Sequence, residues 1–531
     1  MIQTIRSTNG MAVAPHALAS QSALSVLRDG GNAIEATVAG AATISVAYPH
    51  MNGIGGDAFW LIVPQHGAPI AIDAAGPAAA RATIAAYLEA GHAVIPTRGP
   101  LAMNTVAGAI GSWEAALRIS KQHSGQLSLA RLLRDAYQYA TDGIAVTASQ
   151  VSSTVNKFNE VAHQPGFAER FLPNGKIPSV GSLFRQPKLA CVMEQLISDG
   201  LDGFYRGALA EAIAEDLKSV GALLSIDDLN EFQPRVCPSL QIELAEGTAY
   251  NMVPPTQGVI SLAILGILER SGIRVVGPDS ADHIHLCVEA TKQAFKLRDA
   301  YVTDPAYMKV EVESLLSASR LDALANEISL AAALPWGGVS RTGDTVWMGV
   351  IDADGLAVSF IQSIYHEFGS GVVLPTTGLN WQNRGASFSL NPNHLQALQP
   401  RKKPFHTLNP AAARFKDGRS MVYGAMGGDG QPQTQAAVFS RAIWFGQPLQ
   451  QAVCAPRWLL GRTWGQTSDT LKLESRIPGA TVSDLELRGH DIELLGAYDE
   501  TVGHAGAIIR YGNGVLEGAA DPRSDGCVAG Y

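Results

Sequence analysis

A threonine at the start of a predicted β-hairpin is the first residue of this sequence whose type and position could do chemistry. Thr345 precedes an apolar run at residues 346–351, the pair Asp354-Gly355 marks a tight turn, and a second apolar run covers residues 356–361. Two apolar runs joined by Asp-Gly predict a buried hairpin. On this pattern alone, Thr345 is an ordinary β-branched residue that begins a strand.

The same threonine has a second interpretation, as a nucleophile. If the bond between Asp344 and Thr345 is cut, Thr345 becomes a new amino terminus, and its α-amine, with an unperturbed pKa of about 7.7–8.0, lies beside its hydroxyl. A polar turn at residues 338–344 precedes it, and residues 335–338 are the best candidate for an exposed linker. Both interpretations fit the local pattern, so the rest of the chain has to decide between them.

The composition is that of a soluble, well-cored globular protein, and it disfavours several classes of partner. The chain has 531 residues, 46% hydrophobic and 16% charged, and its net charge of −9 argues against nucleic acid, whose phosphates require a basic face. The amino terminus lacks the pattern of a signal peptide, and no stretch reaches the roughly 18 apolar residues of a membrane span. Five scattered cysteines are typical of reduced thiols, so we expect a cytoplasmic protein that binds neither nucleic acid nor membrane.

Two other patterns resemble ligand sites, but the sequence does not favour either. Gly53, Gly55 and Gly56 precede a strand, whereas the glycines of a dinucleotide-binding loop follow a strand and open a helix, so we expect a tight turn. His283 and His285 are two residues apart on a predicted helix, which directs them to different faces. Because no third ligand has a suitable spacing, we expect no metal and no cofactor.

Nine stretches of the chain, read in order, resemble the γ-glutamyltransferase superfamily of N-terminal nucleophile hydrolases. They are GMAVAPHALAS, GGNAIEATVA, NGIGGDAF, VPPTQGV, the hairpin after Thr345, FGSGVV, KPFHTLNP, GAMGGDGQPQ and DPRSDGCVAGY. Together they run nearly from one end of the chain to the other. No single stretch is specific, but nine in the order of the family favour the catalytic interpretation of Thr345.

The resemblance implies a fold class and a processing step. The implied fold is α+β, a four-layer αββα sandwich in which helices cover two β-sheets, and the implied precursor cleaves itself before the threonine. Cleavage gives a large subunit of residues 1–344 and a small subunit of residues 345–531, which stay together as one unit. We expect this heterodimer to dimerise further.

The resemblance also implies catalytic roles for individual residues. The Thr345 hydroxyl attacks first the Asp344 carbonyl and then a substrate amide, and the freed amine takes up the proton. The backbone N–H groups of Gly427 and Gly428 match the oxyanion hole of the family, and Ser363 falls where the family has a hydroxyl that supports the nucleophile. Without the resemblance, the two glycines form an ordinary strand-to-helix turn and Ser363 is a strand serine.

The positions that hold a γ-glutamyl group in the family differ in this chain. Tyr365 and Ser387 replace the asparagine and the aspartate that hold the α-amine, and the family arginine has no counterpart at residues 72–77. His406 and Thr407 replace paired serines. An amino-acid zwitterion therefore loses most of its charged partners, and the pocket should discriminate against it.

Four residues remain as candidate substrate-binding donors, namely Tyr365, Arg384, His406 and Thr407. This set suits a small acid without an α-amine, and it resembles the acylase-like branch of the family. The overall similarity to this branch, more than any single residue, implies a small-molecule amide as substrate, with oxamate first, in a reaction of purine catabolism. Three alternatives stay open: a γ-glutamyl hydrolase or transferase acting on glutathione-like substrates, a glutaryl-cephalosporin-type acylase, and a binding protein that keeps the fold without the chemistry.

Overall fold

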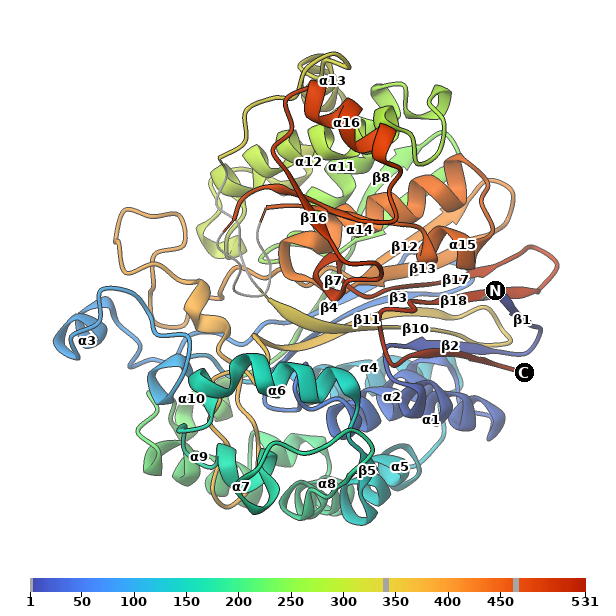
Figure 1. Cartoon of the computed structure of the whole chain (residues 1–531). Helices are drawn as coiled ribbons and strands as arrows, with labels where there is room; N and C mark the ends of the chain where they lie inside the picture. The colour runs from blue at the N-terminus through green and yellow to red at the C-terminus, as the bar shows by residue number, and fades with distance from the viewer. Residues whose placement is uncertain (1–2, 338–342, 462–467) are drawn as a thin grey trace.

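Two seven-stranded antiparallel sheets lie face to face at the centre of the computed structural model, which describes residues 3–337, 343–461 and 468–531 (Figure 1). The first sheet has the order β1 (Ile5–Ser7), β18 (Leu516–Ala520), β17 (Ala505–Arg510), β13 (Ser420–Ala425), β12 (Ala411–Phe415), β9 (Gly247–Asn251) and β8 (Leu240–Leu244). The second has the order β19 (Cys527–Gly530), β2 (Met11–Ala14), β10 (Asp344–Ile351), β11 (Ala357–Tyr365), β3 (Asp57–Val63), β4 (Ile70–Ala74) and β7 (Arg235–Pro238). Most of the predicted polar turn before Thr345, residues 338–342, lies outside the described residues.

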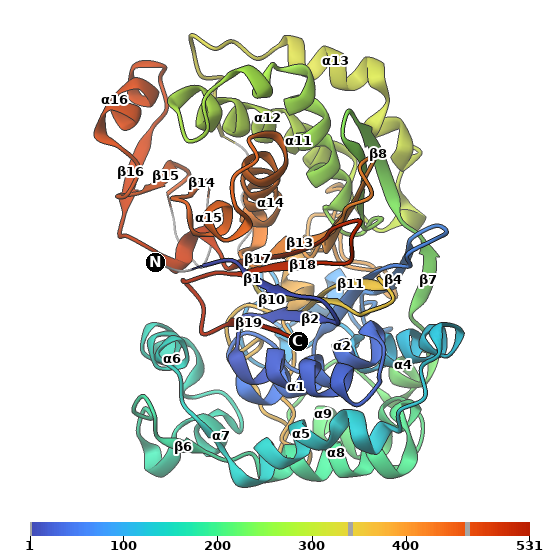
Figure 2. The same cartoon turned by 90° about the vertical axis from the view of Figure 1, so that its right-hand side faces the viewer.

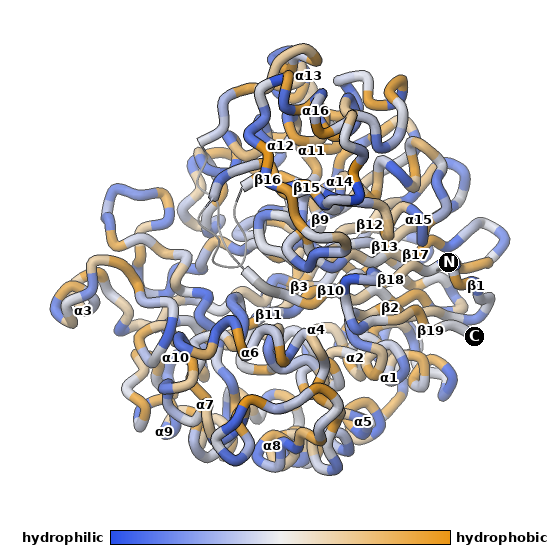
Figure 3. The backbone as a smooth tube through the Cα atoms, viewed as in Figure 1, coloured by the Kyte–Doolittle hydropathy of each residue, from blue (hydrophilic) through white to orange (hydrophobic). Residues whose placement is uncertain are grey.

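Helices cover the outer face of each sheet, which gives the molecule four layers (Figures 1 and 2). The second sheet packs on α1 (Ala17–Arg28), α2 (Ala33–Ala47) and α4 (Ala109–Ser120), and α5 (Leu129–Asp142) packs on α2 and on α8 (Pro187–Asp199). The first sheet packs on α11 (Gly258–Arg270), α14 (Gln431–Phe439) and α15 (Leu449–Cys454), and α12 (Ala281–Tyr301) packs on α11 and α14. Along the outer helix α8, Figure 3 shows hydrophilic and hydrophobic positions interleaved, as is typical of a helix that buries one face, whereas α2 and α14 are buried throughout. The layers confirm the αββα prediction.

Smaller elements surround the four layers. A three-stranded sheet contains β14 (Trp458–Leu460), β15 (Leu471–Glu474) and β16 (Ile492–Leu495), next to α16 (Gly479–Leu487). The other elements are α3 (Ile84–Glu89), β5 (Ile144–Ala145), α6 (Ala148–Val161), α7 (Phe167–Phe171), β6 (Leu183–Phe184), α9 (Ala208–Ser219), α10 (Ile226–Glu231) and α13 (Ala318–Asn326). All five cysteines are free thiols. Among the residues that the structure describes, no helix combines the length and the apolar character that a bilayer crossing requires.

Helix α2 is rich in small residues and packs directly on the central hairpin. Asn32 caps the helix, and Glu35 completes a capping box by accepting a bond from the Asn32 backbone. Every residue of α2 is buried. Gly40 lies directly against β10, since a methyl group added to it would lie 2.3 Å from Cε at the end of the Met348 side chain. The small-residue helix predicted from the sequence thus forms the support beneath β10.

A single tryptophan fixes β10 against the opposite sheet. Trp347 lies in the apolar layer between the two sheets, and its indole N–H donates to Ser359 Oγ at 2.9 Å. Methyl groups added to Gly349, Gly424 or Gly506 would lie 2.7 Å or less from the indole. These glycines come from both sheets and together make the slot that the ring fills. Because Thr345 is two residues from Trp347, this packing also fixes the face on which Thr345 lies.

Buried histidines give the fold a predicted sensitivity to acid. The histidines whose pKa burial lowers include His16, His50, His283, His366, His406, His490 and His504, with values of about 4 for His16 and about 3 for His283. An unfolded histidine titrates near pH 6.5, so below that pH the unfolded chain binds more protons than the folded one. The stability these groups contribute is therefore fully present above pH 6.5 and is lost as the pH falls.

We expect the melting temperature at pH 5 to be at least about 5 °C below that at pH 7.5. Some buried carboxyls instead add stability as the pH falls, because burial raises their pKa. The values are about 7 for Asp57 and Glu500 and about 6 for Asp352. The named histidines outnumber these carboxyls, so the loss on acidification dominates. Calorimetry across this pH range tests the prediction, and a melting temperature that rises on acidification would contradict it.

Candidate active site

Thr345 is the second residue of β10, at one end of the second sheet. In the hairpin, Asp344 pairs with Tyr365 but Val346 pairs with Gln362, so two residues of β11 stand opposite Thr345 alone. This β-bulge is the kind of irregularity that strands use to redirect a side chain, often next to an active site. Side chains alternate along a strand, so Thr345 points to the same side as Trp347, and it is only 1% exposed.

Ser363 belongs to the bulge opposite Thr345. Its hydroxyl accepts a hydrogen bond from the Tyr365 backbone N–H at 2.8 Å. On its other side, Ser363 pairs with Asp57 of β3. Thr345, Ser363 and Asp57 therefore form a row across three neighbouring strands at one end of the second sheet.

A glycine turn that follows strand β13 of the first sheet approaches the row formed by Thr345, Ser363 and Asp57. Gly427 and Gly428 follow β13 with φ values of 117° and 53°, in the region that favours glycine. The turn leads into α14, whose first residue, Gln431, donates from Nε2 to Thr345 Oγ at 3.4 Å. Gln257 Nε2 donates both to the Gly428 carbonyl at 3.0 Å and to the Thr407 carbonyl at 2.9 Å. The predicted glycine pair is thus brought next to the predicted nucleophile.

Tyr365, Arg384 and Thr407 form one cluster beside Thr345. The Arg384 guanidinium carbon lies 3.9 Å from the centre of the Tyr365 ring, and Nη1 donates to Thr407 Oγ at 3.4 Å. Its Nε donates to the Phe405 carbonyl at 2.9 Å. Tyr365 has a φ of 80°, which is uncommon outside glycine and typical of a backbone constrained at a functional site. Three of the four predicted substrate-binding residues therefore lie together.

The chain just before Thr345 covers this cluster. A methyl group added to Gly343 would lie 3.1 Å from the Tyr365 ring and 3.5 Å from Thr407 Oγ. The backbone of Asp344, the predicted cleavage residue, pairs with Tyr365 in the sheet. In the uncut chain, residues 343–344 thus occupy the surface on which Tyr365 and Thr407 would meet a substrate.

The fourth predicted substrate-binding residue, His406, has a different environment. His406 Nε2 lies 2.8 Å from Asp57 Oδ2, and its ring packs edge-on against Phe59 in the apolar layer between the sheets. Asp57 Oδ1 accepts bonds from the backbone N–H groups of Gly76 and Gly108 at 3.1 and 3.0 Å. Burial raises the pKa of Asp57 to about 7 and holds that of His406 well below its usual range. His406 Nε2 thus contacts the carboxylate of Asp57, the first residue of β3, and so helps to position that end of the site.

Sequence reasoning did not single out Asp57, Gln257 or Gln431. Each nevertheless lies in one of the stretches that carried the family resemblance, NGIGGDAF, VPPTQGV and GAMGGDGQPQ. The sequence did contain a signal for these three residues: each is a polar residue in a glycine- or proline-rich turn next to a buried strand. Ser387, which replaces a family aspartate, lies at the edge of the cluster, where its hydroxyl donates to the Phe405 carbonyl at 3.3 Å.

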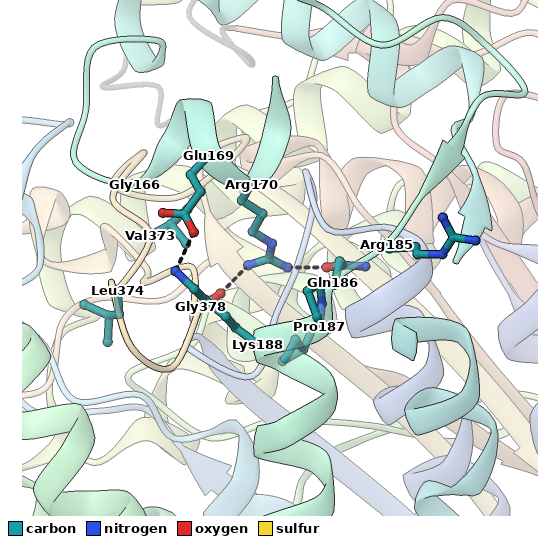
Figure 4. A pocket seen from close by; sticks show the side chains of 11 residues that line it. Gly166, Glu169, Arg170, Arg185, Gln186, Pro187, Lys188, Val373, Leu374 and Gly378 are labelled. Atoms are coloured by element: carbon teal, nitrogen blue, oxygen red, sulfur yellow. Dashed lines mark hydrogen bonds and ion pairs between the residues drawn. The ribbon is translucent and has the colours of Figure 1, made fainter. Parts of the chain in front are cut away.

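A pocket elsewhere in the molecule takes no part in this constellation. It lies between α7, the start of α8 and the loop around residue 378 (Figure 4). Its polar side chains already pair with their surroundings, since Arg170 Nη1 donates to the Gly378 carbonyl at 2.9 Å and Lys188 Nζ contacts Glu169 at 2.5 Å. None of the site residues described above lines it. The candidate active site is therefore the group of residues around Thr345.

Comparison with known proteins identifies the family of the chain. The gamma-glutamyltranspeptidase family profile matches residues 19–531. The chain belongs to this family. An oxamate amidohydrolase proenzyme from Klebsiella pneumoniae is 59% identical over 526 residues, which cover 99% of each protein. The glutathione hydrolase-like YwrD proenzyme of Bacillus subtilis is 39% identical over 531 residues, covering all of both.

A solved structure extends the gamma-glutamyltranspeptidase assignment to the fold. The crystal structure of cephalosporin acylase from Bacillus halodurans superposes with a TM-score of 0.91 at 33% identity, covering 100% of this chain and 97% of that one. Members of this family are proenzymes that are processed into two subunits and use an N-terminal nucleophile. The chain is therefore an enzyme, an amidohydrolase of the N-terminal nucleophile type, and the predicted family and fold class are confirmed.

Proposed function

We propose that Thr345 is the nucleophile and that the precursor cleaves itself between Asp344 and Thr345, giving subunits 1–344 and 345–531. The observation that supports this most directly is the position of Thr345 at the bulged start of a central strand, with Gln431 against its hydroxyl. Thr345 Oγ attacks the Asp344 carbonyl carbon, the peptide C–N bond breaks, and the nitrogen leaves as the new α-amine. Water then hydrolyses the resulting ester and restores the hydroxyl.

In the mature enzyme the same hydroxyl acts on the substrate. The α-amine of Thr345 takes the hydroxyl proton as Oγ attacks the amide carbonyl, and it returns a proton to the departing nitrogen. The N–H groups of Gly427 and Gly428 stabilise the oxyanion, and the Ser363 hydroxyl supports the nucleophile from the bulge. Water releases the acid from the acyl-enzyme. No step requires a metal or a cofactor.

The substrate we propose is oxamate, hydrolysed to oxalate and ammonia. Oxamate carries one carboxylate and one amide on adjacent carbons, so Arg384, Tyr365 and Thr407 would hold the carboxylate while Thr345 meets the amide. Cleavage frees residues 343–344 to move away from that surface. The 59% identity to an oxamate amidohydrolase proenzyme supports the same substrate.

The absence of an arginine at residues 72–77 argues against a γ-glutamyl substrate. The cations nearest this segment, Arg235 and Lys403, pair with Asp73 at 3.2 and 2.8 Å. A substrate α-carboxylate bound at the position of the family arginine would therefore compete with Asp73 for Arg235 and Lys403. We expect ammonia release from oxamate at least about 100-fold faster, in kcat/KM, than turnover of a γ-glutamyl anilide or a glutaryl amide. A preference for the anilide would favour the glutathione-hydrolase alternative, and no turnover of any amide by cleaved protein would favour the inert scaffold.

Replacing Arg384 with lysine is expected to raise KM for oxamate about 10- to 100-fold. Lysine keeps the positive charge but loses the planar, two-pronged contact with a carboxylate and the stacking on Tyr365. The measurement is steady-state kinetics together with a melting curve. Arg441→Lys is the matched control, because Arg441 is also fully buried but binds Asp279 far from Thr345 along the chain. An unchanged KM in Arg384→Lys would contradict the assignment.

We also propose that the two subunits form a heterodimer that dimerises further, in the cytoplasm, and that the reaction serves purine catabolism. A native mass near twice the 56.0 kDa of one chain would support the dimer, and a mass near 56.0 kDa would contradict it. Growth on oxamate-yielding purines as the nitrogen source tests the metabolic role. Fractionation of cells tests the location.

A further inference from the structure

Three side chains that take no part in the candidate active site converge in a way that no catalytic role explains. His285 and Glu289 are one turn apart on α12, and His490 follows α16 more than 200 residues later. One donor atom from each, a ring nitrogen or a carboxylate oxygen, lies within 4.8 Å of the other two, and all three residues are buried. His283, its near neighbour on α12, instead contacts Ser440 Oγ at 2.9 Å, as the different-faces prediction requires.

The hydrogen bonds of His285 prepare it to bind a cation. Its Nε2 lies 2.7 Å from the Ser329 carbonyl oxygen, which can only accept, so Nε2 carries the proton and Nδ1 has a lone pair. That lone pair faces His490 Nε2 at 2.8 Å. Histidines that bind metals almost always donate their other N–H to a carbonyl or a carboxylate, which fixes the tautomer as here.

Glu289 is held in place by the same segment of chain. Its Oε2 accepts from the Leu334 backbone N–H at 2.9 Å, and its Oε1 lies 2.7 Å from Lys292 Nζ. Lys292 also donates to the Leu334 carbonyl at 2.6 Å. Leu334 thus orientates the Glu289 carboxylate. A metal ion would have to compete with Lys292 for the second carboxylate oxygen.

We propose that His285, Glu289 and His490 bind a divalent transition metal of the Zn²⁺ class, with solvent as a fourth ligand. Two imidazoles and one carboxylate are a common protein ligand set for zinc. Tetrahedral bonds of about 2.0–2.1 Å place donor atoms about 3.4 Å apart, so the two histidines need to separate by only about half an ångström. His490 moves its proton to Nδ1 and presents the Nε2 lone pair to the ion.

Such an ion would join the two subunits of the mature enzyme, a consequence that rests on the proposed cleavage. His285 and Glu289 lie before position 344, and His490 lies after it. Ser329 and Leu334, which orientate the first two ligands, belong to the segment that leads to the cleavage bond. Metal binding should therefore hold the end of the large subunit against the small subunit and stabilise their association.

The direct test is titration of chelator-treated full-length enzyme with Zn²⁺ by calorimetry, and with Co²⁺ by its visible absorption. We expect one ion per chain. His490→Gln should weaken Zn²⁺ binding at least about 100-fold. Lys292→Met should tighten it at least about tenfold, because a positive charge next to the ion is removed. His283→Gln, on the same helix, should leave the affinity unchanged.

Absence of binding in both the wild type and Lys292→Met would overturn the proposal, as would binding that His490→Gln does not weaken. Circular dichroism shows whether each variant is folded. Thr345→Ala separates the metal site from the proposed function, because a chain that cannot cleave should bind Zn²⁺ as the wild type does. Loss of Zn²⁺ binding in that variant would contradict a site built from His285, Glu289 and His490.

Discussion

Replacing Thr345 with alanine should leave a single 56.0 kDa chain and lower amide turnover by at least about 10⁴-fold. Alanine removes the hydroxyl that forms both the ester with Asp344 and the acyl-enzyme, and without cleavage no α-amine is released to act as the base. The uncut segment also stays over Tyr365 and Thr407. A denaturing gel and an ammonia-release assay measure the two effects.

Thr345→Ser is the matched control for the first experiment. Serine keeps the hydroxyl and loses only a methyl group, so we expect slower but complete cleavage and measurable turnover. Sequencing of the small fragment should find residue 345 at its amino terminus. If the alanine variant cleaves or turns over at wild-type rates, or if the mature fragment begins at another residue, Thr345 is not the nucleophile.

Replacing Gly427 with alanine is expected to lower kcat by about 10²–10³-fold, the usual effect of losing one oxyanion donor. The φ of 117° at Gly427 is strained for any residue with a Cβ atom, and the new methyl group would lie 3.3 Å from Gly503 Cα. The turn must shift, and its N–H groups shift with it. Since the oxyanion forms only during the reaction, the loss should fall on kcat more than on KM.

Gly446→Ala separates loss of catalysis from general strain. Gly446 also has a positive φ, 63°, but nothing lies within 4 Å of the added methyl group, and the residue is exposed. We expect a small loss of melting temperature and an unchanged kcat. If Gly427→Ala lowers the melting temperature as Gly446→Ala does but keeps wild-type kcat, the oxyanion assignment fails.

The hairpin illustrates which local features the sequence predicted and which it did not. The two apolar runs and the Asp354-Gly355 turn gave both strands, β10 and β11, with ends within a few residues of those observed. The bulge opposite Thr345 was not predicted, because an extra residue leaves no mark in a run that is apolar on both faces. Both faces are buried here, one against α2 and the other against the first sheet, so the alternation that sets register is missing.

His406 illustrates the same limit at the site. Its place in the KPFHTLNP stretch predicted a substrate donor, and Thr407 beside it does contact Arg384. The structure instead joins His406 Nε2 to Asp57, a residue 349 positions earlier in the chain. Pairing between such distant residues depends on which strands become neighbours, and residue types along one strand do not contain that information.

The sequence by itself determined the hairpin and the glycine turn, because each has its own turn chemistry and hydrophobic pattern, and nine stretches in a shared order pointed to the family, its four-layer fold and the candidate nucleophile. Only the tertiary structure decided that the segment before Thr345 covers Tyr365 and Thr407, that Asp57 holds His406, and that His285, Glu289 and His490 meet. These contacts join residues from different elements, which for Asp57 and His406 are 349 positions apart. Their geometry follows from strand order and helix packing, which are properties of the whole folded chain.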